Sequence, residues 1–188
     1  SDSKKIMQTA GLWTTLEKSA AQIESIHVSD KGHRGIARLN RSPNDNDPLG
    51  YVVESRYLRG TLRKNLSQSD IQIWYSTEII DASIEKDRVR LFTSNTEKDI
   101  TAKLLVISDG AYSKTASKLG FCIKSKATGQ KAIIANVTLD RKHRGIAYER
   151  FTQSGVLAML PLLTSMGQSK ASLVWTRSSE CALRLEKA

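Results

Sequence analysis

The stretch "KLLVISDGAYSKTASKLG", residues 103–120, constrains the fold more than any other part of the sequence. Its apolar first half predicts a buried β-strand over 103–108, and its second half predicts a helix over 111–119. Asp109 and Gly110 then follow the carboxyl end of the strand, which is where open α/β sheets bind their ligands. This strand-to-helix unit predicts an α/β fold.

The Asp109-Gly110 pair has two interpretations. A glycine lets the backbone approach a ligand closely, and a carboxylate beside it can accept hydrogen bonds from ribose or ribityl hydroxyls. Alternatively, the pair only shapes a turn, for which Asp-Gly is a common signal. Taken alone, the dipeptide favours the turn.

A second helix is predicted over residues 55–67, where three leucines spaced four residues apart form one apolar stripe. Arg56, Arg59 and Arg63 fall on a different face of this helix. They could contact a phosphate, but a solvated helix face is the commoner reason for such a pattern.

The remaining elements are predicted from periodicity and turn residues. They are a helical segment over 3–19 interrupted at Gly11, antiparallel strands that turn near 85–87, a mixed or antiparallel sheet from residues 23–39 and 129–176, and a closing helix over 178–188. Within the sheet, the hairpin "YERFTQSGVLAMLP" alternates in character, which fits either a solvent-facing sheet or the wall of a pocket.

Composition narrows the function classes only in part. The net charge of +10 is spread along the chain and could serve phosphates, nucleic acid or an anionic membrane surface. Cys122 and Cys181 form no metal-spaced set and indicate a reduced, intracellular protein, which we expect in the cytoplasm. The three histidines match no zinc spacing, so we expect no metal, and no apolar run reaches the ~18 residues of a membrane span.

Several segments together resemble the aromatic-ring hydroxylases of ubiquinone biosynthesis, within the flavoprotein monooxygenases of the para-hydroxybenzoate hydroxylase type. The most specific are "IHVSDKGH" at 26–33 and "AYERFTQSGVLAMLP" at 147–161, and "LLVISDGAYSK" fits the wider flavoprotein class. The matching segments run in family order to about Thr176. The resemblance therefore covers nearly the whole chain.

This resemblance implies FAD as cofactor and NAD(P)H as reductant. Asp109 and Gly110 become expected flavin contacts, and Arg56 an expected contact to the ribityl-phosphate side of the flavin. The hairpin over 147–160 is expected to roof the substrate ring. The implied substrate-binding residues are Tyr148, Arg150 and Met159.

The resemblance also implies a division of the chain. A partial, Rossmann-like FAD-binding domain is expected from residues 1–20 and 50–125, and a substrate-binding β-sheet domain from 21–49 and 126–188. The family's GxGxxG unit and its Gly-Asp motif do not occur in the chain, and the helix entry reads Glu-Ser-Arg rather than Glu-Asn-Arg. We therefore expect an internal fragment, inactive and without FAD when isolated.

For the whole protein, the resemblance implies hydroxylation of a polyprenylated phenol and favours the 6-methoxyphenol step. It further implies contact with other ubiquinone-biosynthesis proteins, peripheral contact with the inner membrane or homo-oligomers, and no nucleic acid. Two alternatives stay open. One is a basic, non-catalytic nucleic-acid-binding module, although its aromatic residues do not interleave with the basic ones; the other is a scaffold subunit that has lost oxidation.

Overall fold

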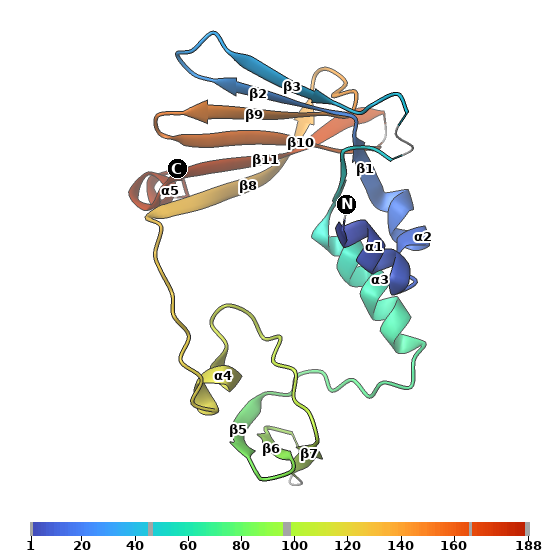
Figure 1. Ribbon diagram of the computed structural model, residues 1–188, viewed down its shortest axis with the longest axis vertical. Helices are drawn as coiled ribbons and strands as arrows, with labels where there is room; N and C mark the ends of the chain where they lie inside the picture. Colours follow the sequence, from blue (N-terminus) through green and yellow to red (C-terminus); the bar gives the residue numbers. More distant parts are fainter. Residues whose placement is uncertain (1, 45–46, 96–98, 166, 187–188) are drawn as a thin grey trace. The chain divides into compact units, whose positions relative to one another are not determined.

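A six-stranded sheet lies at the centre of one of two compact units in the computed structural model (Figure 1). The structure describes residues 2–44, 47–95, 99–165 and 167–186. The first unit comprises Ser1–Asp70 and Thr128–Ala188, and the second comprises Ile71–Ala127. The domain boundaries predicted from the sequence do not coincide with these units, because the segments 1–20 and 50–70 belong to the unit of the six-stranded sheet.

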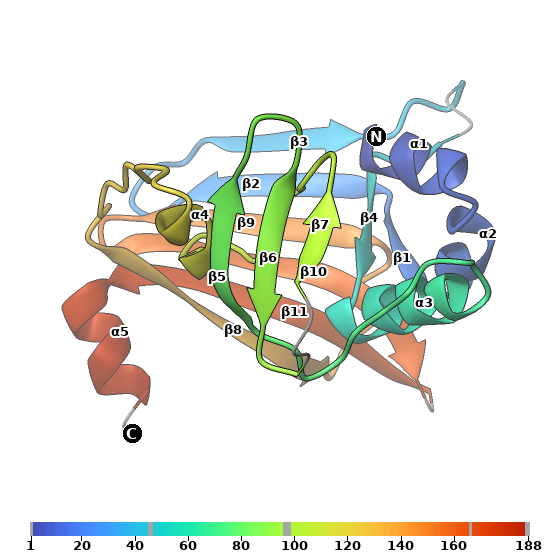
Figure 2. The same cartoon turned by 90° about the horizontal axis from the view of Figure 1, so that it is seen from below.

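The sheet of the first unit is mixed, which confirms the predicted mixed or antiparallel sheet (Figure 2). All its neighbouring strands pair antiparallel except β2 and β9, which are parallel. In spatial order the strands are β3 (Ile36–Asn40), β2 (Ser25–Asp30), β9 (Ile146–Thr152), β10 (Gly155–Ser165), β11 (Gln168–Ser178) and β8 (Gln130–Leu139).

A tight turn joins β9 to β10, and it requires a glycine. Thr152 Oγ1 donates a hydrogen bond to the carbonyl oxygen of Gly155 at 2.7 Å, and Gly155 has a φ of +134°. A Cβ atom placed on Gly155 would lie 1.8 Å from the carbonyl oxygen of Thr176. The backbone of β11 therefore passes too close to Gly155 for any side chain there.

Helices and a two-stranded ribbon complete the first unit and enclose a small core. The elements are α1 (Asp2–Thr9), α2 (Trp13–Leu16), the 3₁₀ turn η1 (Glu17–Ser19), β1 (Ala20–Ile23), β4 (Gly50–Val53) and α3 (Ser55–Ser67). Leu12, Trp13 and Leu16 are buried in this core, and the Trp13 ring meets the Tyr51 ring edge-on at 4.7 Å. The predicted interruption at Gly11 is confirmed, since α1 ends at Thr9 and Gly11 has a φ of +69°.

The second unit is built on a three-stranded antiparallel sheet of β5 (Ile79–Ile84), β6 (Val89–Thr93) and β7 (Ile100–Ala102), with the short helix α4 (Lys114–Lys118). The predicted turn near 85–87 is confirmed, because the N–H of Glu85 donates to the carbonyl of Arg88 at 2.8 Å. Lys118 Nζ on α4 donates to the carbonyl of Ile79 at 2.8 Å. This bond ties the helix to the sheet.

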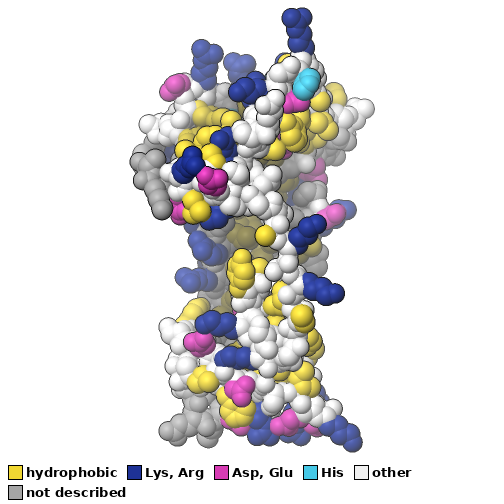
Figure 3. Space-filling view, turned by 90° about the vertical axis from the view of Figure 1, so that its left-hand side faces the viewer, with side chains coloured by type: hydrophobic (Ala, Val, Ile, Leu, Met, Phe, Trp, Pro, Cys, Tyr) yellow, Lys and Arg dark blue, Asp and Glu magenta, His cyan; other side chains and the backbone are white. Residues whose placement is uncertain are grey.

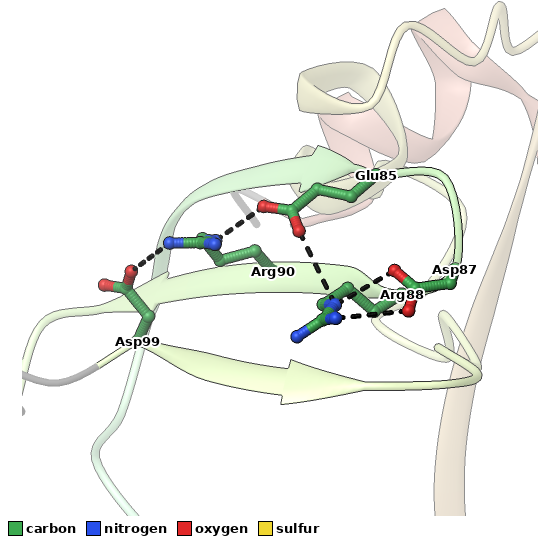
Figure 4. A network of polar contacts seen from close by, with 5 residues as sticks. All are labelled: Glu85, Asp87, Arg88, Arg90 and Asp99. Atoms are coloured by element: carbon green, nitrogen blue, oxygen red, sulfur yellow. Dashed lines mark hydrogen bonds and ion pairs between the residues drawn. The ribbon is translucent and has the colours of Figure 1, made fainter.

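An ion-pair network crosses this small sheet (Figure 4). Arg90 on β6 lies 2.7 Å from Glu85 and 3.2 Å from Asp99, and these bonds raise its pKa, with Glu85 the larger cause. Arg88 pairs with Asp87 at 3.0 Å. Exposed pairs of this kind each contribute only ~0–1 kcal/mol, so the network helps to order the strands rather than supplying the unit's stability.

The predicted buried strand over 103–108 is wrong. These residues form no strand, and the side chains of Leu104 and Val106 are 77% and 74% exposed. A strand needs a neighbour for its backbone hydrogen bonds, and no described strand pairs with this segment. The helix expected over 111–119 is the shorter α4, which starts where Ser113 Oγ accepts the N–H of Ala116 at 2.9 Å.

The chain closes with α5 (Ser179–Glu186), as predicted, while the last two residues of the expected helix lie outside the described residues. None of the helices in the described part of the chain has both the length and the apolar character needed to cross a bilayer. On the face drawn in Figure 3, Lys and Arg side chains are spread among acidic and hydrophobic ones rather than gathered in one patch.

Candidate functional site

Arg56 stands in the first turn of α3, directly after β4. Its guanidinium donates to Glu54 Oε1 at 3.0 Å and lies 4.7 Å from the centre of the Tyr57 ring. The Glu54 hydrogen bond is the main cause that raises the pKa of Arg56. The Arg56 side chain is nevertheless 65% exposed, so it can still meet an anion from solvent.

Glu54 connects the start of α3 to the large sheet. While its Oε1 holds Arg56, its Oε2 accepts a hydrogen bond from Asn136 Nδ2 on β8 at 3.1 Å. No side chain caps the first turn of α3. Glu54 therefore fixes the helix start by its contact with the sheet.

A cavity of about 310 Å³ lies between the start of α3 and the sheet. From the side of β4 and the start of α3 it is lined by Val52, Val53, Glu54, Ser55 and Arg56, and from the six-stranded sheet by Ile134, Asn136, Leu162 and Ser172. Its lining thus combines four aliphatic side chains with five polar or charged ones, so it offers both apolar contact and hydrogen-bonding groups.

The sheet residues of this cavity share one face of the sheet. Asn136 on β8 is directly opposite Ser172 on β11, and Ser172 is opposite Leu160 on β10. Opposed residues of antiparallel strands point to the same face, and residues two apart on a strand do so as well. We call the face that carries Ile134, Asn136, Leu162 and Ser172 the α3-side face.

Tyr148, Arg150 and Met159 lie on the other face, called here the far face. Met159 is opposite Tyr148 and is one residue away from Leu160, so its side chain points away from the α3-side cavity. None of these three residues lines that cavity, so the structure does not bring them together with Arg56. Substrate binding by these three residues is therefore an untested alternative to substrate binding on the α3-side face.

Tyr148 and Met159 instead line a hollow of about 320 Å³ beside the loop that follows β8. His143 anchors this loop: its Nδ1 accepts the N–H of Gly145 at 3.0 Å, and its Nε2 bonds to the carbonyl of Leu162 at 2.9 Å. Because Nδ1 is the acceptor, Nε2 carries the proton and donates to Leu162. His143 therefore has a structural role here.

Asp109 and Gly110 belong to the second unit, where Asp109 supports the start of α4. Its Oδ2 accepts the N–H of Thr115 at 3.3 Å. A hydrogen bond from Ser113 is the main cause that lowers the pKa of the Asp109 carboxyl, and hydrogen bonds from Thr115 lower it further. The carboxyl is therefore ionised at neutral pH. Gly110 has a φ of +97° and an open space around it. The turn interpretation of the pair thus has a direct structural basis, and the exposed carboxylate can still accept hydrogen bonds from a ligand.

These residues fit parts of FAD chemically. A carboxylate such as that of Asp109 accepts hydroxyl protons, and the exposed guanidinium of Arg56 suits a phosphate. Gly110 has no heavy atom within 4 Å of a hypothetical Cβ, so the backbone there is accessible. Each of the three groups is therefore compatible with the cofactor contact expected from the sequence.

A prediction follows for the Asp109 carboxylate in the chain as it stands. Replacing Asp109 by Asn removes a charged acceptor for the Thr115 N–H, so we expect faster hydrogen exchange at that amide. A carboxyl whose pKa is lowered on folding stabilises the folded state at pH values above its unfolded pKa, which is near 3.8. This stability is lost as the pH falls through the lower pKa of the folded state. Amide protection of Thr115 should therefore fall on acidification in the parent chain but not in the variant. Asp70→Asn is the control, and unchanged protection in Asp109→Asn would contradict the assignment.

The sequence did not identify Glu54, Asn136, Leu162 or Ser172 as site residues. Period-2 alternation does show that Leu160 and Leu162 point away from Met159. It does not show which face α3 approaches, because that depends on the Glu54–Asn136 contact between residues far apart in the chain.

Comparison with known proteins places this arrangement in a family. Residues 2–186 match the family model described as FAD binding domain. Ubiquinone hydroxylase UbiL of Rhodospirillum rubrum is 30% identical over 178 residues, which cover 94% of this chain and 40% of UbiL. Human ubiquinone biosynthesis monooxygenase COQ6 is 28% identical over 149 residues, which cover 74% of this chain and 31% of COQ6. The chain thus spans about two fifths of UbiL and less of COQ6.

Solved structures share the fold at low sequence identity. A variant of Pseudomonas aeruginosa PqsL superposes with a TM-score of 0.76 at 18% identity, over 97% of this chain and 50% of PqsL. A complex of CtdE with FAD and a substrate gives a TM-score of 0.71 at 14% identity, over 94% of this chain and 46% of CtdE. Because the family model matches nearly every residue, the chain belongs to the FAD binding domain family.

Proposed function

We propose that the whole protein is an FAD-dependent monooxygenase that hydroxylates a polyprenylated phenol in ubiquinone biosynthesis, with NAD(P)H as reductant. The observation that carries this proposal is the α3-side cavity, which joins Arg56 to a patch of the sheet made of two aliphatic and two polar side chains. The similarity to UbiL and COQ6 supports the reaction class. Within that class we favour a 2-polyprenyl-6-methoxyphenol as substrate.

When bound, FAD would accept the hydride and activate dioxygen, which is chemistry that amino-acid side chains do not supply. The residues of this chain would bind and orient the cofactor and the substrate. Arg56, held by Glu54, would neutralise phosphate on the cofactor. Asp109 would accept a hydroxyl hydrogen bond from the ribityl or ribose part.

On the substrate side, the α3-side face would hold the phenol. Ile134, which is 68% exposed, would pack against the ring and the first part of its apolar chain, which removes apolar surface from water. Leu162 lines the same cavity but is already buried. Asn136 and Ser172 are directly opposite each other on neighbouring strands and offer polar groups to the ring oxygens. Asn136 is itself oriented by Glu54, so the start of α3 would position both cofactor and substrate contacts.

The test is turnover by the whole protein loaded with FAD. We expect NAD(P)H oxidation that depends on a 2-polyprenylphenol, together with a product that has gained one oxygen atom, detected by mass spectrometry. Oxidation of NAD(P)H without any oxygenated product from a panel of polyprenylphenols would contradict the proposed substrate class. A protein that does not bind FAD at all would contradict the proposed function as a whole.

A further inference from the structure

The far face of the large sheet carries an apolar groove of about 540 Å³ that the proposed function does not use. Leu157, Leu173 and Trp175 form its floor. Lys31, Arg150 and Arg177 also line it. An apolar floor bordered by three cations indicates a partner with an apolar surface and negative charges.

The register of the sheet explains why these side chains meet. Arg150 on β9 is opposite Leu157 on β10, and Leu157 is opposite Trp175 on β11. The three side chains therefore form one row across three neighbouring strands and point to the same face. Figure 1 shows these strands side by side.

The three cations of the groove differ in their contacts with neighbouring side chains. Arg177 lies 5.0 Å from the centre of the Trp175 ring and donates to Ser154 Oγ at 2.6 Å. For Lys31 and Arg150, the described part of the chain offers no ion pair and no side-chain hydrogen bond. The described lining of the groove contains no Asp or Glu either. Its positive charge is therefore not compensated by the residues around it.

A helix already packs on the same face beside this groove. Ala182 of α5 is only 4% exposed, and Ala182 and Leu185 line one hollow together with Ile133. Ile133 on β8 is directly opposite Trp175, so α5 covers the neighbouring position of the same row. The far face therefore accepts a helix that buries the small side chain of Ala182.

We propose that this groove is the docking site of an acidic amphipathic helix. The apolar stripe of that helix lies on Leu157, Leu173 and Trp175, and Asp or Glu residues along the stripe pair with Arg150 and Lys31. A nucleic acid would leave the aliphatic floor without an apolar partner. The adjacent α5 favours a helix over a lipid as the occupant, because this face already packs one.

Two synthetic peptides of about 18 residues, long enough to form a helix, test the proposal with the 188-residue chain. Both carry Leu at positions spaced three and four apart, and they differ only in having Glu or Lys at the flanking positions. We expect calorimetry to detect binding of the Glu peptide and at least about tenfold weaker binding of the Lys peptide, equivalent to ~1.4 kcal/mol. Binding of the Glu peptide should also change the tryptophan fluorescence of the chain, and this change should be lost in Trp175→Phe.

Charge reversal locates the site. Arg150→Glu should weaken binding of the Glu peptide at least about tenfold, whereas Arg59→Glu, the same change on α3, should leave it within about twofold. Both variants should have unchanged circular dichroism, because both residues are exposed. Equal binding of the two peptides, or equal effects of the two variants, would overturn the proposal. So would Arg150-dependent binding to vesicles of phosphatidylcholine with phosphatidylglycerol in the absence of any binding to the Glu peptide.

Discussion

Gly155→Ala is expected to destabilise the first unit by about 3 kcal/mol or more, the sum of overpacking and backbone strain. The new Cβ would lie 1.8 Å from the Thr176 carbonyl oxygen, and the contact is with backbone of a central strand, which cannot turn aside as a flexible side chain can. The φ of +134° at Gly155 adds strain for any residue with a side chain. Urea unfolding followed by circular dichroism measures the loss.

Gly129→Ala is the matched control for Gly155→Ala. Gly129 also has a positive φ, of +71°, but no atom lies within 4 Å of its hypothetical Cβ. Its substitution therefore reports the backbone strain alone, which we expect to cost about 1–2 kcal/mol. If the two variants unfolded at the same urea concentration, the close approach of β11 to the β9–β10 turn would be disproved.

Arg56→Ala should weaken FAD binding to the whole protein by about 10- to 150-fold, which corresponds to one charge-assisted hydrogen bond of ~1.5–3 kcal/mol. The guanidinium is held in place by Glu54 but remains mostly exposed, so its loss removes a positioned cation without opening the core. The affinity is measured by titrating apoprotein with FAD and following the visible flavin absorbance.

Arg59→Ala is the control, because it removes the same charge from an exposed position on the same helix. We expect FAD binding to Arg59→Ala within about twofold of the parent. A similar loss in both variants would mean that the net charge of α3 matters rather than a contact of Arg56. No loss in either would remove Arg56 from the cofactor site.

Periodicity was sufficient to predict most of the elements. The leucine stripe of α3, the Gly11 break and the strands of the large sheet follow from local patterns that the structure confirms. The segment 103–108 was wrong for a physical reason. An apolar run predicts that a segment is buried. A strand forms only where a neighbouring strand pairs with its backbone hydrogen-bonding groups, and this depends on the rest of the fold.

The site could be predicted less well than the elements. The family resemblance predicts Arg56 and Asp109 as cofactor contacts, which stay predictions, and the structure adds what holds them: Glu54 for Arg56, and the Ser113 and Thr115 bonds for Asp109. The sequence could not predict which face of the six-stranded sheet carries the cavity beside α3. Tyr148 and Leu162 belong to the two strands of one hairpin and point to opposite faces of the sheet, and the contact of Glu54 with Asn136 is what distinguishes these faces.

The central claim is that substrate binds on the α3-side face, and the KM of the whole protein for its polyprenylphenol tests it most directly. Ile134 lines the α3-side cavity and is 68% exposed, so Ile134→Trp should fill that cavity while the fold is kept. Tyr148→Trp enlarges a side chain on the far face, although by less. We predict that Ile134→Trp raises KM by about tenfold or more with normal FAD content, and that Tyr148→Trp leaves KM within about twofold. A rise in KM for Tyr148→Trp with none for Ile134→Trp would place the substrate on the far face and contradict the account.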